Sequence, residues 1–296
     1  MAGERTSTAT GILGWFDQRM PVMDFWNKHL AQYYAPKNFN VWYYFGSLAL
    51  LVLVNQIVTG IWLTMHYKPS AAEAFSSVEY IMRDVEWGWL IRYMHSTGAS
   101  FFFICVYLHM FRGLMYGSYQ KPRELVWVLG MLIFLALMAE AFLGYVLPWG
   151  QMSFWGAQVI VSLFGAIPYV GEGLVQWIQG DYLPSDATIN RFFALHVVAL
   201  PISLLGLVVL HLGALHEVGS NNPDGVDIKK KKDAQGKPLD GIAFHPYYTV
   251  KDLFGVGVFL MLFAFVIFFA PTFGDLFLEY DNFNPADPMV TPAHIK

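Results

Sequence analysis

Charged residues are scarce in this sequence. Only 14% of its 296 residues are Asp, Glu, Lys or Arg, whereas 56% are hydrophobic. A typical soluble domain has about 25% charged and about 45–50% apolar residues. The net charge is −4, which gives no support for binding nucleic acid. The composition therefore indicates a protein whose main partner is the lipid bilayer.

Cysteine is almost absent as well. The single residue, Cys105, lies inside an apolar run. One cysteine excludes a disulfide framework within the chain and a metal site built from several thiolates. A cleavable signal pattern is also missing, because no apolar run of about 7–15 residues occurs within residues 1–19. We expect membrane insertion to use the first spanning helix itself.

Five long apolar runs stand out instead. A membrane-spanning helix needs about 20 mostly apolar residues, and the segments that provide them are 42–65, 93–116, 125–147, 192–215 and 253–270. Residues 152–177 are apolar but interrupted by Gly and Pro, which predicts short interfacial helices instead of another crossing. Residues 21–34 mix apolar and charged side chains and predict an interfacial amphipathic helix. The predicted fold class is an all-α membrane protein.

Lysine and arginine are distributed unevenly between the loops. With five spans, the N-terminal segment and the loops at 117–124 and 217–252 share one side of the membrane. That side carries twelve basic residues, namely Arg5, Arg19, Lys28, Lys37, Lys121, Arg123, Lys229, Lys230, Lys231, Lys232, Lys237 and Lys251. The opposite side carries five, namely Lys68, Arg83, Arg92, Arg191 and Lys296. Because cytoplasmic loops carry an excess of Lys and Arg, the N-terminus is predicted to be cytoplasmic.

Four of the nine histidines lie inside the predicted spans. His95 and His109 are 14 residues apart, which places them on one helix face, about 21 Å apart along the axis. His196 and His211 are 15 residues apart, and a kink at Pro201 would absorb the extra residue. The two helices run in the same direction, so His95 and His196 share the outer depth. His109 and His211 then share the inner depth, which predicts two stacked pairs of imidazoles.

A haem iron suits such pairs of imidazoles. Two neutral imidazoles in a dry site fill both axial positions of a haem, whereas zinc takes three or four protein ligands. We expect no further Cys, His or carboxylate at either histidine level. A transporter that uses the histidines as a proton path is the alternative outside redox chemistry. A reduced-minus-oxidised spectrum separates the two, because only the first reading predicts haem b bands.

Two pairs of glycines repeat the histidine spacing. Gly46 and Gly60 in the first span are 14 residues apart, and so are Gly130 and Gly144 in the third. Glycine destabilises a helix interior and needs a reason there. Packing of small residues between helices explains any one of them, but not the repeated period at matching depths. The pattern predicts a four-helix bundle that encloses two haems, with bare helix faces beside each macrocycle.

Arginines flank the same histidines. Arg92 lies three residues before His95, and Arg112 lies three residues after His109. Haem propionates are anionic, and arginine pairs with carboxylates through two parallel hydrogen bonds. Arg191, five residues before His196, is a third candidate at the outer haem. The alternative is that each arginine only extends from a helix end towards the membrane surface.

Several motifs carry a resemblance to a known family. They are WGW at 87–89 leading to His95, the run 109–119, GYVLPWGQMSFWG at 144–156, RFFALH at 191–196, HEVGSNNP at 216–223 and HPYYTVKD at 245–252. Together they extend over nearly the whole chain. The sequence resembles the cytochrome b/b6 family, in particular cytochrome b of bacterial cytochrome bc1 complexes, which are ubiquinol–cytochrome c reductases.

The resemblance implies a Q cycle coupled to proton translocation. Ubiquinol is oxidised at an outer site, and one electron goes to a Rieske iron–sulfur protein and then to cytochrome c1. The other electron crosses two b haems and reduces quinone at an inner site. By this match, His95 and His196 ligate the low-potential outer haem, and His109 and His211 the high-potential inner haem. The implied location is the bacterial inner membrane, in a homodimeric complex.

The inner quinone site is supported by chemistry as well as by the match. Quinone reduction takes up protons, so it needs titratable groups close to water. His216 lies five residues after His211, and Lys251 and Asp252 open the fifth predicted span at the same level. His and Asp side chains can donate protons to a reduced ring. The family pattern assigns His216 and Asp252 to this role and places Lys251 near them, together with Ser220 or Asn221.

The outer quinol site is less complete. Tyr145 and Gly156 match positions that line the quinol pocket of the family. The third element of that pocket is a Pro-Glu-Trp-Tyr motif, which would be expected directly after TPAHIK at 291–296. We therefore expect the C-terminal region of the family, with its further helices, to be lacking from this sequence.

The expected domain organisation follows these assignments. Residues 1–41 form a cytoplasmic segment, 42–216 the dihaem bundle, 217–252 a cytoplasmic loop, and 253–296 the fifth helix with the start of the C-terminal region. The 15-residue histidine interval resembles the b6 type and some bacterial bc1 proteins. A dihaem anchor of a dehydrogenase is the competing redox reading, but such an anchor has no need of the outer pocket that residues 148–177 imply.

Overall fold

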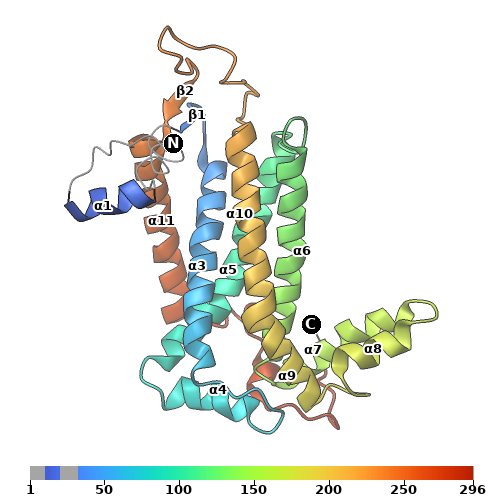
Figure 1. Cartoon of the computed structure of the whole chain (residues 1–296). Coiled ribbons are helices and arrows are strands. Elements are labelled where there is room, and N and C mark those ends of the chain that lie inside the picture. Colours follow the sequence, from blue (N-terminus) through green and yellow to red (C-terminus); the bar gives the residue numbers. More distant parts are fainter. Residues whose placement is uncertain (1–10, 21–32, 296) are drawn as a thin grey trace.

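The computed structural model describes residues 11–20 and 33–295 and is dominated by helices that run side by side (Figure 1). In this part of the chain, five helical segments are long and apolar enough to cross a membrane. Three of these segments are single helices, namely α5 (Gly88–Met115), α6 (Glu124–Val146) and α11 (Phe244–Phe269). The first segment, Val41–Thr64, contains α3 (Tyr44–Thr64). The fourth segment, Asp186–Val218, contains α9 (Asp186–Ala194) and α10 (Leu200–Val218). The predicted fold class is confirmed.

Three spanning helices begin earlier than their apolar runs. The second begins at Gly88, the fourth at Asp186 and the fifth at Phe244. Apolar runs mark only the part of a helix that meets hydrocarbon, whereas hydrogen bonding continues into polar turns. At the fourth helix, Ser185 and Thr188 form a capping box that fixes the start outside the apolar run. The loop predicted at 217–252 therefore ends at the start of α11, and Asp252 lies inside that helix.

The extra residue between His196 and His211 is accommodated in a π-helical turn. This turn spans Leu195–Ala199, between α9 and α10, and contains His196 itself. A π turn holds one more residue than an α turn. Pro201 follows directly and has no N–H to donate to Val197, which removes one α-helical hydrogen bond in this region. The predicted kink at Pro201 is thus replaced by a wide turn on its N-terminal side.

Short elements gather at the two ends of the bundle (Figure 1). At one end lie α4 (Ala74–Arg83), α7 (Gln151–Ser162) and α8 (Gly171–Gln179), so residues 152–177 form short helices as predicted. At the other end, β1 (Tyr34–Pro36) pairs antiparallel with β2 (Gly241–Ala243). Following the predicted orientation, we call the β1–β2 end the inner end and the α4–α7 end the outer end.

The N-terminal segment contains a helix that hydrophobicity alone does not predict. The short helix α1 covers Gly11–Arg19. The amphipathic helix predicted at residues 21–34 falls almost entirely on residues 21–32, which are outside the described residues. Only its last two residues, Tyr33 and Tyr34, are described, and Tyr34 belongs to β1. This prediction therefore stays a prediction.

Helix packing places histidine helices beside glycine helices. The most extensive contacts in the bundle are between α3 and α5 and between α6 and α10. A buried apolar cluster in mid-bundle, which includes Val52 of α3, Phe102 of α5 and Leu204 of α10, also receives Phe263 of α11. Many apolar side chains on the outside of the spanning helices are exposed, as expected for surfaces that contact lipid. The interior of the bundle also contains two cavities, one on each side of this apolar cluster along the bundle.

Candidate functional site

Two cavities lie within the bundle, at the levels of the four membrane histidines. The inner cavity has a volume of about 800 Å³ and is lined by His109 and His211. The outer cavity has a volume of about 530 Å³ and is lined by His95 and His196. Both volumes fall in the usual range of ligand sites, about 300–1,000 Å³. The structure thus brings the histidines together in the two pairs predicted from their spacing.

Each pair of imidazole rings is close enough to share one metal atom. The ring centroids of His95 and His196 are 6.2 Å apart, and those of His109 and His211 are 6.3 Å apart. Metal–imidazole bonds are about 2.0–2.1 Å long, so one atom between the rings can reach both. Within the described residues, no group of three or more His, Cys, Asp or Glu side chains could hold a metal ion. The two-ligand geometry therefore fits haem iron and not a zinc centre.

The hydrogen bonds of the outer pair fix which ring nitrogen is free. Thr59 Oγ1 donates its only hydrogen to the carbonyl oxygen of Asn55 at 2.6 Å, so it accepts from His95 Nδ1 at 2.9 Å. The Nδ1 of His196 lies 2.9 Å from the carbonyl oxygen of Glu140, which can only accept. Both Nδ1 atoms are therefore protonated, and both Nε2 atoms keep the lone pair that a metal requires.

The four glycines lie against these same rings. Gly60 and Gly144 flank the outer pair, and Gly46 and Gly130 the inner pair, as their depths predicted. A Cβ added at Gly144 would overlap the His196 ring, with 2.9 Å to Nδ1 and 3.0 Å to Nε2. At the other three positions the added Cβ would lie 3.1 Å from His109 Cε1 (Gly46), 3.2 Å from His95 Cε1 (Gly60) and 3.3 Å from His211 Cε1 (Gly130). Each glycine thus leaves room for an imidazole in its observed position.

Two of the three predicted arginines line the cavities. Arg92 lines the outer cavity and Arg112 the inner one. Arg112 Nη2 lies 3.3 Å from His109 Nδ1, and its guanidinium carbon lies 4.7 Å from the centre of the Tyr43 ring. Its Nε is buried and, among the described residues, has no hydrogen-bond partner. A buried guanidinium with an unused donor suits an anionic group in this cavity.

Arg191 is placed elsewhere, which corrects its predicted role at the outer haem. It is exposed, is absent from the lining of the outer cavity, and donates from Nη1 to the carbonyl oxygen of Trp177 at 2.6 Å. At about 100° per residue, a position five residues before His196 lies about 140° around the helix from it. The shorter three-residue offsets of Arg92 and Arg112 correspond to only about 60°. Arg191 therefore joins α9 to the end of α8.

A carboxyl group lies at the outer histidine level, contrary to the expectation that none would. Glu140 Oε1 is 3.1 Å from His196 Nδ1. Glu140 is one helical turn before Gly144 on α6, so both residues are on the face that meets His196. In the sequence, Glu140 stands out as the single acidic residue inside the apolar run 125–147, and this feature could have indicated a role within the bundle.

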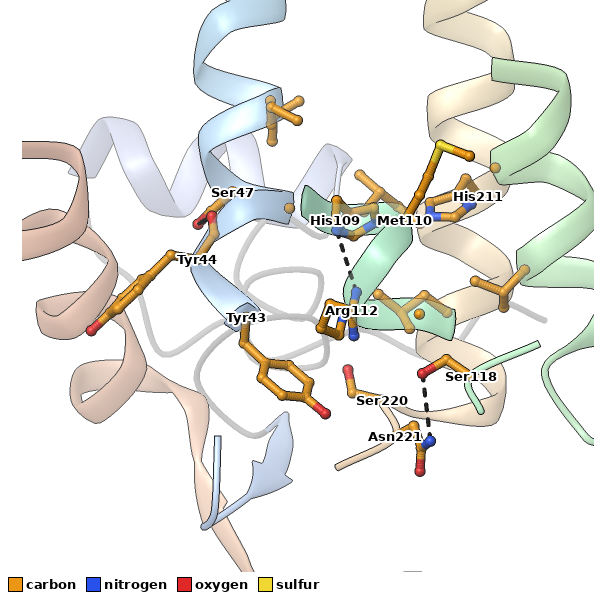
Figure 2. A pocket seen from close by; sticks show the side chains of 18 of the residues that line it. Tyr43, Tyr44, Ser47, His109, Met110, Arg112, Ser118, His211, Ser220 and Asn221 are labelled. Carbon is orange, nitrogen blue, oxygen red and sulfur yellow. Dashed lines mark hydrogen bonds between the residues drawn. The ribbon is translucent and has the colours of Figure 1, made fainter. Parts of the chain in front are cut away.

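The inner end of the inner cavity is polar. His216, Ser220, Asn221, Lys251 and Asp252 all line it, as the sequence predicted. Figure 2 shows Ser220 and Asn221 on one side of the cavity and the facing rings of His109 and His211 above them. The structure also adds residues that the sequence interpretation missed, namely Ser47, Tyr43, Tyr33 and Tyr248. Tyr248 lies within the HPYYTVKD motif but was given no role there, and no motif marked the other three residues.

Hydrogen bonds hold several of these polar groups in place. Asn221 donates to the carbonyl oxygen of Tyr116 at 2.6 Å, which fixes the loop after α10 to the end of α5. Lys251 donates to the Tyr247 hydroxyl at 2.8 Å. His216 Nδ1 lies 2.8 Å from the carbonyl oxygen of Leu212. This contact fixes the orientation of the His216 ring relative to its own helix.

A segment that follows α11, called the closing segment below, forms part of the wall of the outer cavity. Residues 270–295 fold back onto α7, where Asn282 Oδ1 accepts from the Ser153 N–H at 2.8 Å and Gln151 donates to the Val290 carbonyl oxygen at 2.9 Å. Phe277, Leu278 and Asn282 line the cavity. These contacts join residues more than 120 positions apart, and sequence periodicity gives no sign of such contacts.

Tyr145 is the predicted outer residue with the clearest polar contact. It lines the outer cavity, and its hydroxyl donates to Glu279 Oε2 at 2.8 Å. Glu279 belongs to the closing segment and was not predicted. Gly156 lies beside the Tyr145 ring but does not line the outer cavity. Tyr67 lines the cavity too, and burial raises the pKa of its hydroxyl, which donates to the Leu147 carbonyl oxygen at 2.7 Å.

Comparison with known proteins agrees with this geometry. The family model described as cytochrome b/b6/petB matches residues 30–219. Cytochrome b of Allochromatium vinosum is 64% identical over 100% of this chain and 71% of its own length. Cytochrome b of Rhodospirillum rubrum is 56% identical over 96% of this chain and 67% of its own length. A solved structure titled hyperthermophilic respiratory complex III superposes with a TM-score of 0.86, at 41% identity, over 96% of this chain and 73% of its own.

All of these matches cover the helices that carry the four histidines and the four glycines. The identities are far above the level at which a likeness shows the fold alone, and the structural neighbour is a respiratory complex. The chain is therefore an integral membrane component of electron transport of the complex III type, and it belongs to the cytochrome b/b6 family.

Proposed function

We propose that this chain is the core subunit of a ubiquinol–cytochrome c reductase. In this proposal, quinol is oxidised at the outer cavity and quinone is reduced at the inner cavity, with proton translocation as the result. The observation that carries it is the stacking of two facing histidine pairs, each of which lines its own cavity towards one end of the bundle. A single redox site, or a site without ligand pairs, would not need this duplication.

Each cavity is proposed to bind one haem b without a covalent link. His95 and His196 are the proposed axial ligands at the outer level, and His109 and His211 those at the inner level. Bound there, the two haems would supply one-electron transfer from one membrane face to the other. Thr59 orients the His95 ring at the outer level, because its hydroxyl accepts the hydrogen of Nδ1 and leaves Nε2 as the nitrogen available to bind iron. Arg92 and Arg112 are the proposed partners of the propionates.

At the inner cavity, His216 and Asp252 are the proposed proton donors. Both line the cavity, as does Ser47. Lys251 is the adjacent cation that stabilises negative charge on a reduced ring, and Ser220 or Asn221 offers a further polar contact. Proton donors at this end suit a quinone that takes up protons from the cytoplasm.

At the outer cavity, Tyr145 is the proposed positioning group for the quinol. Its hydroxyl is held by Glu279, so its orientation is fixed with respect to the cavity. Tyr67 differs from Tyr145 in its partner, because its hydroxyl donates to the backbone carbonyl oxygen of Leu147. Gly156 keeps space beside the Tyr145 ring.

The proposed partners follow from the family. They are a Rieske iron–sulfur protein, cytochrome c1 and a second copy of the complex, in a bacterial cytoplasmic membrane with the N-terminus in the cytoplasm. The support is the similarity to cytochrome b of bacteria and to a chain of a respiratory complex III. Copurification of a Rieske protein and cytochrome c1 would separate this function from a dihaem anchor of a dehydrogenase.

A purified complex tests the proposal directly. We expect a reduced-minus-oxidised spectrum with two b haems per chain, together with quinol-dependent reduction of cytochrome c. Absence of haem b bands would rule the proposal out. Two b haems without quinol–cytochrome c activity, in a preparation that retains a dehydrogenase subunit, would support the anchor instead.

Replacement of His216 by alanine should slow electron delivery to quinone at the inner cavity. The change removes a proposed proton donor but no proposed haem ligand. General acid–base groups contribute about 10²–10⁴-fold, and Asp252 remains, so we expect reoxidation of the inner haem to slow by at least tenfold. Stopped-flow spectroscopy at the b-haem band measures this rate. The control is His245→Ala, since His245 lies close by on α11 but does not line the inner cavity. Equal rates in both variants would remove His216 from the site.

Replacement of Tyr145 by phenylalanine should weaken quinol oxidation while both haems stay bound. The ring is kept and only the hydrogen bond to Glu279 is lost. One such bond to a charged group contributes about 1.5–3 kcal/mol, so the rate at which quinol reduces the outer haem should fall by about tenfold or more. Tyr67→Phe is the matched control in the same cavity. If Tyr67→Phe slowed the reaction as much as Tyr145→Phe, the assigned role of Tyr145 would be wrong.

A further inference from the structure

We propose that Gln56, supported by Asn55, is a positioning residue that fixes the orientation of His95 at the outer level. This inference rests on the proposed function, because it takes His95 as an axial ligand of the outer haem. The two amide side chains belong to α3, whereas His95 belongs to α5. The proposed role therefore acts across the contact between these two helices.

Two amide side chains lie side by side inside the first spanning helix. Polar side chains are costly within a membrane span and need a partner there. Gln56 Nε2 donates to the backbone carbonyl oxygen of His95 at 2.9 Å, and Asn55 Nδ2 donates to that of Met94 at 3.0 Å. A carbonyl oxygen can only accept, so both amides must present their NH2 groups to α5. The amides thus hold α5 at the residue that carries the outer imidazole and at its neighbour.

The two amides also hold each other. Asn55 Nδ2 lies 3.0 Å from Gln56 Oε1 and donates to it. An NH2 group carries two hydrogens, and those of Asn55 are divided between Met94 and Gln56. With Oε1 held in this way, the NH2 group of Gln56 points at the carbonyl oxygen of His95. Asn55 therefore sets the orientation of Gln56, and Gln56 makes the contact with His95.

His95 is held by α3 at two places. Thr59, nearly one turn after Gln56, contacts the ring at Nδ1, whereas Gln56 contacts the backbone carbonyl oxygen. The ring planes of His95 and His196 are perpendicular, with an interplanar angle of 90°. A ring held at Nδ1 alone would follow a small rotation of α5, because the bond to Thr59 leaves the backbone free. The bond from Gln56 opposes this rotation and preserves the perpendicular arrangement.

Gly98 provides the space that the amides occupy. It is buried and lies three residues after His95, so it is on the same side of α5. A Cβ added at Gly98 would overlap Gln56 Oε1 and would lie 2.8 Å from Asn55 Nδ2. Any larger residue at this position would displace both amides from their carbonyl partners.

The inner level is built differently. The ring of His109 faces Arg112 of its own helix at 3.3 Å, and the interplanar angle of the inner pair is 63°. Fourteen residues before the two amides the chain has Val41 and Trp42, neither of which carries a side-chain amide. An amide pair that served only to join α3 to α5 would fit anywhere along their contact. Its place at His95 favours a role in orienting that ligand.

Electron paramagnetic resonance of the oxidised, complete complex tests this role. In low-spin ferric haems with two imidazole ligands, the largest g value is highest when the ring planes are perpendicular. Gln56→Met keeps the length of the side chain and removes the NH2 donor. We expect both haems to stay bound, most of the outer-haem signal to move to a lower g value, and the inner signal to stay unchanged. Asn55→Leu should cause a smaller shift in the same direction, because the contact with His95 remains possible.

Two further variants sharpen the test. Ser203→Ala is the control for loss of a polar group in a spanning helix, since its hydroxyl donates to the Ala199 carbonyl oxygen of the same helical segment. It should leave both signals unchanged. Gly98→Ala displaces the amides without changing them and should shift the outer signal in the same direction as Gln56→Met. The double variant should show no larger shift than Gly98→Ala alone, whereas independent sites would add.

The outcomes separate this proposal from the proposed function. An unchanged outer signal in Gln56→Met, with haem bound, would overturn the role of Gln56 and leave the dihaem assignment intact. Equal shifts of both haem signals, or additive shifts in the double variant, would overturn it as well. If Gln56→Met binds no outer haem, Asn55→Leu decides: a change confined to the outer haem supports the proposal, and an unchanged signal or an equal effect on both haems overturns it. Absence of haem b from the native complex would instead refute the proposed function.

Discussion

Replacement of His109 by asparagine is expected to remove the inner haem and spare the outer one. The inner level offers two facing imidazoles, and the described residues supply no third metal ligand there. Asparagine keeps a polar side chain of similar size but does not replace the imidazole nitrogen. The outer pair is about four helical turns away along α5, so its geometry should stay intact. The haem b content should therefore fall from two per chain to one.

Haem quantification and spectroscopy check this result. The remaining haem should show the band and the potential of the outer site. His95→Asn is the mirror variant and should leave only the inner haem. His216→Asn is the matched control, since this histidine lines the inner cavity without facing His211. Loss of both haems from a stably inserted His109→Asn chain, or of neither, would contradict the layered pairing.

Replacement of Gly144 by alanine should have nearly as large an effect at the outer level. The added methyl group would overlap the His196 ring, with 2.9 Å to Nδ1. His196 cannot move away freely, because its Nδ1 is held by Glu140. Metal–ligand distances tolerate only about 0.2 Å of change. We expect the outer haem to be lost or bound at less than half occupancy, while the inner haem is retained.

Two glycine variants serve as controls for this prediction. Gly206 on α10 has open space around it, so Gly206→Ala should leave both haems bound. At Gly130 the added Cβ would lie 3.3 Å from His211 Cε1, which a small shift relieves, so Gly130→Ala should only weaken the inner haem. If the outer haem were bound at full occupancy in Gly144→Ala, the close approach of α6 to His196 would not be required for haem binding.

Much of the bundle was predictable because helical periodicity acts over short distances. The spacing of His95 and His109 fixes their face and depth from one helix alone, and Gly130 and Gly144 follow the same rule. Local spacing also separates Arg92, which reaches its cavity, from Arg191, which does not. In these cases the number of residues between two positions gives the angle between their side chains around the helix axis, at about 100° per residue.

Features that depend on contacts between distant segments were not predictable in this way. Glu140 was visible as an acid in an apolar run, but its partner lies 56 positions away. The bond between Tyr145 and Glu279 spans 134 positions. The π turn at Leu195–Ala199 changes the register of hydrogen bonds and not the hydrophobic pattern. Such features require knowledge of which helices are neighbours, and periodicity within one helix does not provide it.

The closing segment at 270–295 has a consequence for the order of biogenesis. The four helices that carry the histidine and glycine levels are complete at Val218, well before this segment leaves the ribosome. The wall formed by Phe277, Leu278 and Asn282 is added only after α11 has been inserted. The growing chain thus passes through a stage at which both histidine pairs exist and the outer cavity still lacks this wall. Cofactor loading during this stage would reach the outer histidine pair before Phe277, Leu278 and Asn282 have formed their part of the cavity wall.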